Sequence, residues 1–123
     1  MKKVMTSNGS IGHGDGSPIS GGVFVITSAP DVKAKIDNAG IYVTPLSYSF
    51  SGGSASGFVS GSVSGGGTIV STASKVKVGG KLVMRLEDSG TMSAAGVLTG
   101  GGAGSISGPV EVVSAGQTKV QAD

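Results

Sequence analysis

The residues that could carry acid–base or metal chemistry are few. The chain has 123 residues, with one histidine and no cysteine. That histidine, His13, lies between two glycines and two positions before Asp15, so it is the one candidate metal ligand. A transition-metal site needs about three or four protein ligands, and a loop imidazole is the simpler interpretation of His13. We therefore expect no cofactor, with zinc or iron at His13 left as the alternative.

Serine is abundant, but its surroundings do not fit a catalytic nucleophile. A nucleophile elbow places serine at the centre of Gly-x-Ser-x-Gly, whereas Val63 holds the centre of the segment 61–65. The glycines do not form a phosphate loop either, because Leu82 follows Gly80-Lys81 where Ser or Thr is required. One histidine also leaves little for general-base catalysis. The sequence therefore predicts that the protein is not an enzyme.

Composition indicates a thin β structure in a single domain over residues 1–123. Glycine occurs 24 times, aromatic residues make up 4% and charged residues 13% of the chain. So little charge is unusual for a disordered chain, and so many small residues favour closely approaching strands over a thick core. No segment keeps a helical apolar pattern. We expect an all-β fold with little or no helix.

Charge and hydropathy exclude several classes of partner. The net charge is +2 and the basic residues are scattered along the chain, which does not favour nucleic acid. No apolar run is long enough for a membrane helix, so an integral membrane protein is not expected. The polar residues 6–16 follow Met1-Lys2-Lys3 where a secretory signal would be apolar. We therefore expect no secretory export.

The elements that organise the chain are a hairpin and its repeats. Gly79-Gly80 separates two short alternating runs within residues 75–88, which predicts a tight two-residue turn. Three apolar lead-ins end in Ser28, Ser71 and Ser114, spaced 43 residues apart both times. Such a period indicates repeated β units, placed approximately at residues 20–46, 64–88 and 107–123. The third unit stops without a return strand.

The segments between these units are rich in glycine and serine. The spacing of Tyr48 and Phe50 predicts strands here, not flexible linkers. Arg85 and Asp88, which close the central hairpin, are interpreted as an exposed charge pair at a strand edge. The sequence leaves two interpretations open for the lysines of the units: they face solvent, or they belong to strand edges offered to a partner. These lysines are Lys33, Lys35, Lys75, Lys77 and Lys81.

One segment resembles a known family signature. Residues 80–88 read Gly-Lys-Leu-Val-Met-Arg-Leu-Glu-Asp and resemble the Gly-Lys-Pro-Ala-Ala-Arg-Val-Gly-Asp signature of the PAAR-repeat proteins. Gly80, Lys81, Arg85 and Asp88 match it, and the Pro-Ala-Ala core does not. The segments 26–33 and 12–21 are similar to the Ser-Pro-Asp-Val strand and to the opening His-Gly stretch of that family.

The resemblance implies a fold, a partner and a place of action. PAAR proteins are small conical β proteins that sit as one monomer on a trimeric β-helical spike in type VI secretion systems and contractile phage tails. It thus implies a non-enzymatic tip that caps and sharpens the spike and contacts the target bacterial envelope transiently. Family members often bind zinc through several His and Cys residues, of which only His13 is matched here. The expected partner-binding residues are Val32, Lys33, Val76, Lys77, Lys119 and Val120.

An alternative of another class remains open at this stage. A β-solenoid adhesion module could present a flat Ser/Gly-rich face to a glycan or a cell surface. Adhesive solenoids usually continue for many repeats, whereas this chain has three units. The spike tip is therefore the preferred hypothesis.

Overall fold

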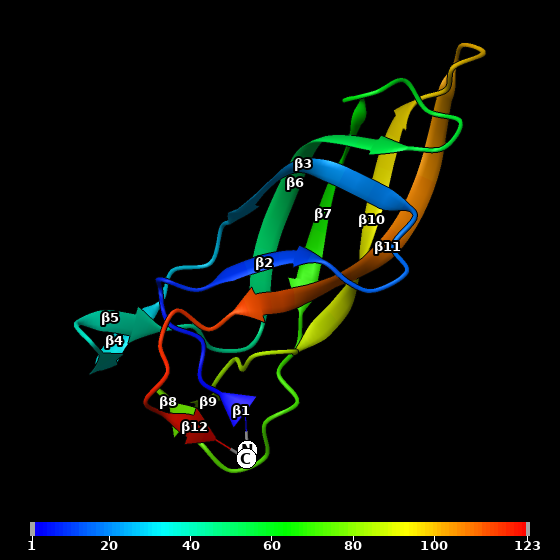
Figure 1. Ribbon diagram of the computed structural model, residues 1–123. Helices are drawn as coiled ribbons and strands as arrows, with labels where there is room; N and C mark the ends of the chain where they lie inside the picture. Colours follow the sequence, from blue (N-terminus) through cyan, green and yellow to red (C-terminus); the bar gives the residue numbers. More distant parts are fainter. Residues whose placement is uncertain (1, 123) are drawn as a thin grey trace.

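The computed structural model describes residues 2–122 and is all-β (Figure 1). The strands are β1 (Lys2–Lys3), β2 (Ser10–His13), β3 (Ile19–Ile26), β4 (Asp31–Ile36), β5 (Ala39–Ile41), β6 (Leu46–Ala55), β7 (Val63–Ile69), β8 (Lys77–Val78), β9 (Lys81–Leu82), β10 (Ser89–Val97), β11 (Ala103–Ser114) and β12 (Gln121–Ala122). The predicted all-β class is confirmed. Within residues 2–122 there is no helix long and apolar enough to cross a membrane.

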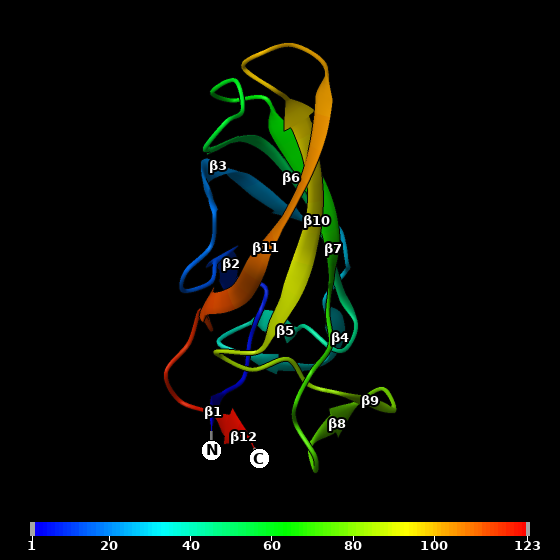
Figure 2. The same ribbon diagram turned by 90° about the vertical axis from the view of Figure 1, so that its right-hand side faces the viewer.

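Six strands form one nearly closed, barrel-like sheet. Their order is β2-β11-β10-β7-β6-β3, and every neighbouring pair in it is antiparallel. The sheet opens between β2 and β3, its two edge strands. Three smaller sheets, β4–β5, β8–β9 and β1–β12, lie together at one end (Figure 2). We call these three sheets, with the residues that join them to the main sheet, the base.

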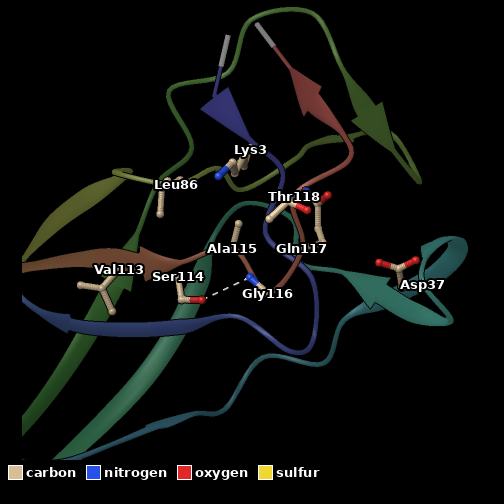
Figure 3. Close-up of a pocket in the computed structure, with 9 residues that line it drawn as sticks. All are labelled: Lys3, Asp37, Leu86, Val113, Ser114, Ala115, Gly116, Gln117 and Thr118. Atoms are coloured by element: carbon tan, nitrogen blue, oxygen red, sulfur yellow. Dashed lines mark hydrogen bonds between the residues drawn. The ribbon is translucent and has the colours of Figure 1, made fainter.

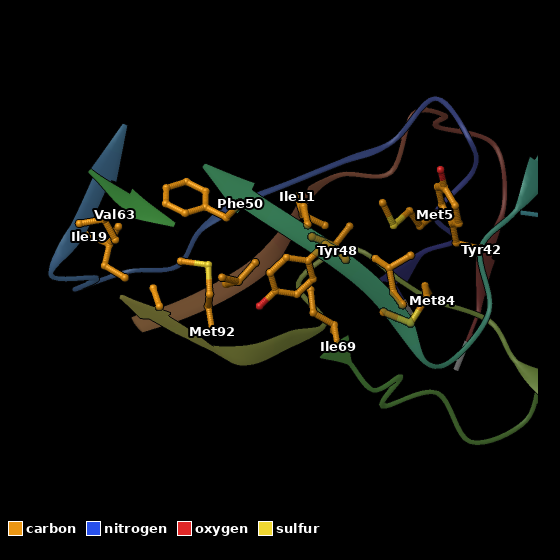
Figure 4. Close-up of a cluster of buried hydrophobic side chains, with 14 residues drawn as sticks. Met5, Ile11, Ile19, Tyr42, Tyr48, Phe50, Val63, Ile69, Met84 and Met92 are labelled. Carbon is orange, nitrogen blue, oxygen red and sulfur yellow. The ribbon is translucent and has the colours of Figure 1, made fainter. Parts of the chain in front are cut away.

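The glycine- and serine-rich segments form the long strands, as their alternation predicts. In β6 the rings of Tyr48 and Phe50 are buried, while Ser49 and Ser51 lie on the outer face. Successive side chains of a strand point to opposite faces, so in β6 these serines lie on the outside and the large apolar residues fill the inside. The main core is drawn in Figure 4 and comprises Met5, Ile11, Ile19, Tyr42, Leu46, Tyr48, Phe50, Val63, Ile69, Met84, Met92, Ala94, Val110 and Val112.

Glycine makes room for the ring of Phe50 in the main core. A Cβ on Gly53 would lie 2.4 Å from Cε2 of Phe50, and one on Gly22 would lie 2.5 Å from its Cζ. Both distances are shorter than van der Waals contact, so the ring occupies space that only glycine leaves free. In this thin barrel, glycine content and aromatic packing are therefore linked.

The hydroxyl of Tyr48 is buried, and no partner for it occurs in residues 2–122. Burial raises the pKa of Tyr48 above its usual 10.0, because the phenolate is the form that desolvation disfavours. The folded state therefore keeps its full stability below about pH 10 and loses it as the pH rises through the folded-state pKa.

We expect Tyr48→Phe to reduce this alkaline loss. At neutral pH the same substitution should change the free energy of unfolding by less than about 1 kcal/mol, since no hydrogen bond is removed. Urea unfolding at pH 7 and above pH 10, compared between wild type and variant, measures both effects. Equal alkaline losses in the two proteins would contradict the assignment.

The predicted Gly79-Gly80 turn is confirmed. Lys77 pairs with Leu82 and Val78 with Lys81, and the φ angles of Gly79 and Gly80 are 60° and 83°. Two successive positive φ values define the type I′ turn that suits the right-handed twist of a hairpin.

Replacing both turn glycines with valine should destabilise the protein by about 2–4 kcal/mol, because a β-branched residue at positive φ is strained. At position 79 a Cβ would also lie 2.5 Å from Oδ2 of Asp31. Gly100→Val is the control, since Gly100 faces open space without a positive φ. Thermal melts should separate the two variants, and similar losses in both would show that the turn is not critical.

Candidate docking site at the base

Three chain segments meet at the base in a closed cycle of backbone hydrogen bonds. The amide of Met5 donates to the carbonyl of Met84 at 2.8 Å, that of Met84 to Tyr42 at 2.9 Å, and that of Tyr42 to Met5 at 3.1 Å. Each segment thus donates to one neighbour and accepts from the other. This is the pattern of a three-fold axis, made by one chain.

A second set of bonds repeats the pattern two residues away. Its members are Ser7 N–H to Gly40 O, Thr44 N–H to Leu82 O, and Leu86 N–H to Lys3 O, at 2.8–2.9 Å. Each donor lies two residues after Met5, Tyr42 or Met84, and each acceptor lies two residues before one of these three residues. The three-fold pattern therefore extends over about five residues of each segment.

Side chains of the cycle alternate between two cores. Met5, Tyr42 and Met84 point into the main core. Their preceding neighbours form a second cluster with small apolar residues of the base, and the whole cluster is Val4, Ile36, Ile41, Ala73, Val83 and Ala122, with Ala34, Val78 and Leu82 packed against it. The cycle is thus held by apolar packing on both sides.

The third unit obtains its return strand from the other end of the chain. Strand β1 pairs with β12, and the amide of Val4 donates to Val120 O at 3.1 Å. In the second unit the amide of Val83 donates to Val76 O in the same way at 3.2 Å. The repeat pattern in the sequence did not reveal this return strand, because each unit was expected to be one continuous segment. Strand β1 lies more than 100 positions before β12.

The six residues expected to bind a partner all lie in the base, in or beside its small sheets. Val32, Val76 and Val120 are exposed by 64%, 40% and 41%. Lys33, Lys77 and Lys119 are exposed as well. Each of the three units therefore presents one solvent-facing valine with a neighbouring lysine.

The interpretation of Arg85 and Asp88 as an exposed charge pair is wrong. Both are buried, with 8% and 1% of their surfaces exposed. Asp88 accepts hydrogen bonds from Arg85 N, Thr72 N and the Thr72 hydroxyl. The Arg85 guanidinium donates to Thr72 Oγ1 at 2.7 Å and to Ala122 O at 3.1 Å. These two residues fasten the second unit to the strand β12 of the third.

A groove of about 530 Å³ lies beside the cycle at the third unit (Figure 3). It is lined by Lys3, Asp37, Leu86, Val113, Ser114, Ala115, Gly116, Gln117 and Thr118. At its rim Lys119 Nζ donates to Asp37 Oδ1 at 2.7 Å, and this hydrogen bond and charge raise the pKa of Lys119. Gln117, buried beneath, donates to Val4 O and Val120 O.

His13 lies away from the base, at the opening of the main sheet. Its Nε2 is 2.8 Å from Gly21 O, and because a carbonyl only accepts, Nε2 carries the proton. The bond links β2 to β3 across the opening. The ring packs edge-on against Phe24 and Phe50, with centroids 5.0 and 5.2 Å away.

This environment does not fit a metal ligand. The buried Nδ1 of His13 has no partner in the described chain, and aromatic rings flank it. No three His, Cys, Asp or Glu side chains converge anywhere in residues 2–122. The zinc that the family resemblance implies therefore lacks its donor set here. His13 instead connects the two edge strands through its hydrogen bond to Gly21 O, and we call this contact the latch.

Comparison with protein-family models, with curated proteins and with solved structures found no match. The resemblance to the PAAR-repeat proteins therefore rests on the residues quoted above.

Charge is concentrated in the base. All nine basic residues lie there, namely Lys2, Lys3, Lys33, Lys35, Lys75, Lys77, Lys81, Arg85 and Lys119. Four of the seven acidic residues accompany them in the described part, namely Asp31, Asp37, Glu87 and Asp88. The net charge of +2 thus understates the positive charge of this end of the molecule.

Proposed function

We propose that this protein caps the blunt end of a trimeric β-helical spike and forms the tip of a contractile injection apparatus or phage tail. The closed three-segment hydrogen-bond cycle of Met5, Tyr42 and Met84 carries this proposal. A monomer meets a three-fold partner without mismatch only if it offers three similar surfaces. One chain that imitates three satisfies that condition.

The chemistry of the base indicates how such a cap would bind. Each unit offers an exposed valine and a small two-stranded sheet. Strand edges can extend a partner's β-structure through main-chain hydrogen bonds, while the valines bury apolar area. The concentration of lysine favours a partner whose end carries carboxylates. On this proposal the protein assembles in the bacterial cytoplasm and travels outward on contraction.

The fold does not have the solenoid form on which the adhesion alternative was based, but adhesion can still be tested. Solenoids stack repeats that contact only their neighbours in line, whereas here the three units close around one axis and every strand pair is antiparallel. Adhesion through the serine-covered outer face would instead make binding independent of the base.

We expect the protein to bind one copy per trimer of the β-helical spike. Native mass measurement of the purified complex determines this ratio directly. A complex of three copies per trimer would overturn the proposal, because it would make the internal three-fold pattern irrelevant. Binding to cells or glycans without binding to the spike would favour adhesion instead.

Matched variants locate the contact. Replacing Val32, Val76 and Val120 with aspartate should weaken spike binding at least about tenfold, because three buried apolar contacts become charged. The control replaces Val23, Val25 and Val97, which have similar exposure of 62%, 53% and 50% but lie on the main sheet. Equal loss in both triple variants would show that the base is not the docking surface.

A further inference from the structure

The end of the molecule opposite the base is formed by two loops. They join β6 to β7 and β10 to β11, and they reach beyond the loop between β2 and β3 (Figure 1 and Figure 2). Two backbone hydrogen bonds hold the loops together, from Val59 N to Val97 O at 2.7 Å and from Thr99 N to Gly57 O at 3.0 Å. The Ser62 side chain adds a bond to each backbone group of Val97. The two loops therefore form one connected end.

Four apolar side chains gather at this end, and we call them the apex cluster: Phe58, Val59, Val97 and Leu98. Phe58 and Leu98 form an isolated antiparallel bridge and are half-buried. Val59 and Val97 are exposed by 43% and 50%. The cluster thus presents apolar surface to solvent at the end of the molecule opposite the base.

The strands that lead to the apex cluster carry a single charged residue, Glu111 in β11. Residues 38–74 and 89–110 contain no Asp, Glu, Lys or Arg. Outside the base the charged residues of the described chain are Asp15, between β2 and β3, and Glu111, in β11. All basic residues lie at the other end, so the molecule has a charged base and a neutral apical half.

We propose that the apex cluster is a lipid-contact site, which inserts at the boundary between headgroups and acyl chains of a bilayer. Apolar side chains gain free energy on leaving water there, and a neutral surrounding avoids the large cost of placing charge in a membrane. This proposal depends on the proposed function in one respect only: binding of the base to the spike would orient the molecule so that the apex meets a membrane first.

The same chemistry sets the depth and the lipid preference of this contact. Gly100, Gly101 and Gly102 form an exposed turn, and exposed backbone groups resist entry into hydrocarbon. Unforced contact should therefore stay shallow. Without basic residues near the apex, it should not depend on anionic lipid.

The absence of tryptophan from the chain permits a site-specific test. Val59→Trp places a fluorophore in the apex cluster, and Val32→Trp places one in the base at an exposed position. On addition of zwitterionic phosphatidylcholine vesicles at moderate salt, we expect a blue shift for Val59→Trp and none for Val32→Trp. Circular dichroism of both variants confirms that they are folded.

A second pair of substitutions tests the apolar requirement. In the Val59→Trp background, Val97→Asp should weaken vesicle binding at least about tenfold. Val113→Asp, at a side chain of nearly equal exposure, should leave it unchanged. Equal effects of the two substitutions would overturn the proposal.

Three further outcomes would also overturn it. These are no shift at either tryptophan, a shift only with phosphatidylglycerol vesicles and at the base, and a concentration-dependent apex shift without lipid, which would indicate self-association. None of them bears on how many copies bind a spike trimer, so the proposed function is tested separately.

Discussion

Replacing Asp88 with alanine is expected to destabilise the protein by about 3–5 kcal/mol, the range for breaking a buried, hydrogen-bonded charge interaction. The carboxylate is 1% exposed and accepts from Arg85 N, Thr72 N and the Thr72 hydroxyl. Its removal leaves these donors without their acceptor, and each buried orphan costs about 1–3 kcal/mol. The Arg85 guanidinium, which shares the Thr72 hydroxyl, also loses its nearby counter-charge.

The effect should appear as a lower denaturant midpoint with an unchanged slope. Because folded domains are stable by only about 5–15 kcal/mol, part of the population could unfold near room temperature. Asp15→Ala is the matched control, since Asp15 is exposed and its loss should cost less than about 0.5 kcal/mol. A loss below 1 kcal/mol for Asp88→Ala would mean that the buried cluster is replaceable by solvent.

This cluster also shows where the sequence is informative and where it is not. The pair at positions 85 and 88 was recognisable from its spacing, but its burial was not, because burial depends on β12 and Thr72 from other units. Ala122 O, an acceptor for Arg85, lies 37 positions away. Charge next to a hairpin favours solvent exposure on average, and here tertiary contacts override that preference.

Local features were predicted better than those that depend on the whole chain. The turn at Gly79-Gly80 and the alternation of Tyr48 and Phe50 follow from backbone geometry and side-chain period alone. The closing of the third unit by β1 could not be read forward along the chain. The hydrogen-bond cycle was equally hidden, because Met5 lies outside the segments that repeat in sequence, and backbone hydrogen bonds leave no side-chain signature.

The role of His13 was hidden for a related reason. A histidine between glycines has no periodicity that assigns it to a face, so its sequence suggested a loop or a ligand. Its function as a latch depends on Gly21 O in a strand that the sheet brings opposite to it. The open edge between β2 and β3 is itself a property of the sheet order, and no local pattern reports it.

Two valines of the base allow effects on folding to be distinguished from effects on docking, because each can be replaced by aspartate in turn. Val83 and Val76 belong to the second unit and are joined by a hydrogen bond from Val83 N to Val76 O. Val83 is completely buried in the second core, whereas Val76 is 40% exposed. Aspartate at position 83 would place its carboxylate among apolar side chains, whereas aspartate at position 76 would place its carboxylate in water.

Val83→Asp should therefore cost about 3–5 kcal/mol or prevent folding, because no described neighbour in that core offers the charge a partner. Val76→Asp should change the free energy of unfolding by less than about 1 kcal/mol yet weaken binding to the trimeric spike. Denaturant unfolding measures the first difference, and titration of the folded variant against the spike measures the second. If Val76→Asp bound as tightly as wild type, the exposed valines would not be the docking contacts. If Val83→Asp unfolded at the wild-type denaturant concentration, the cycle of three segments would not be the structural centre of the base.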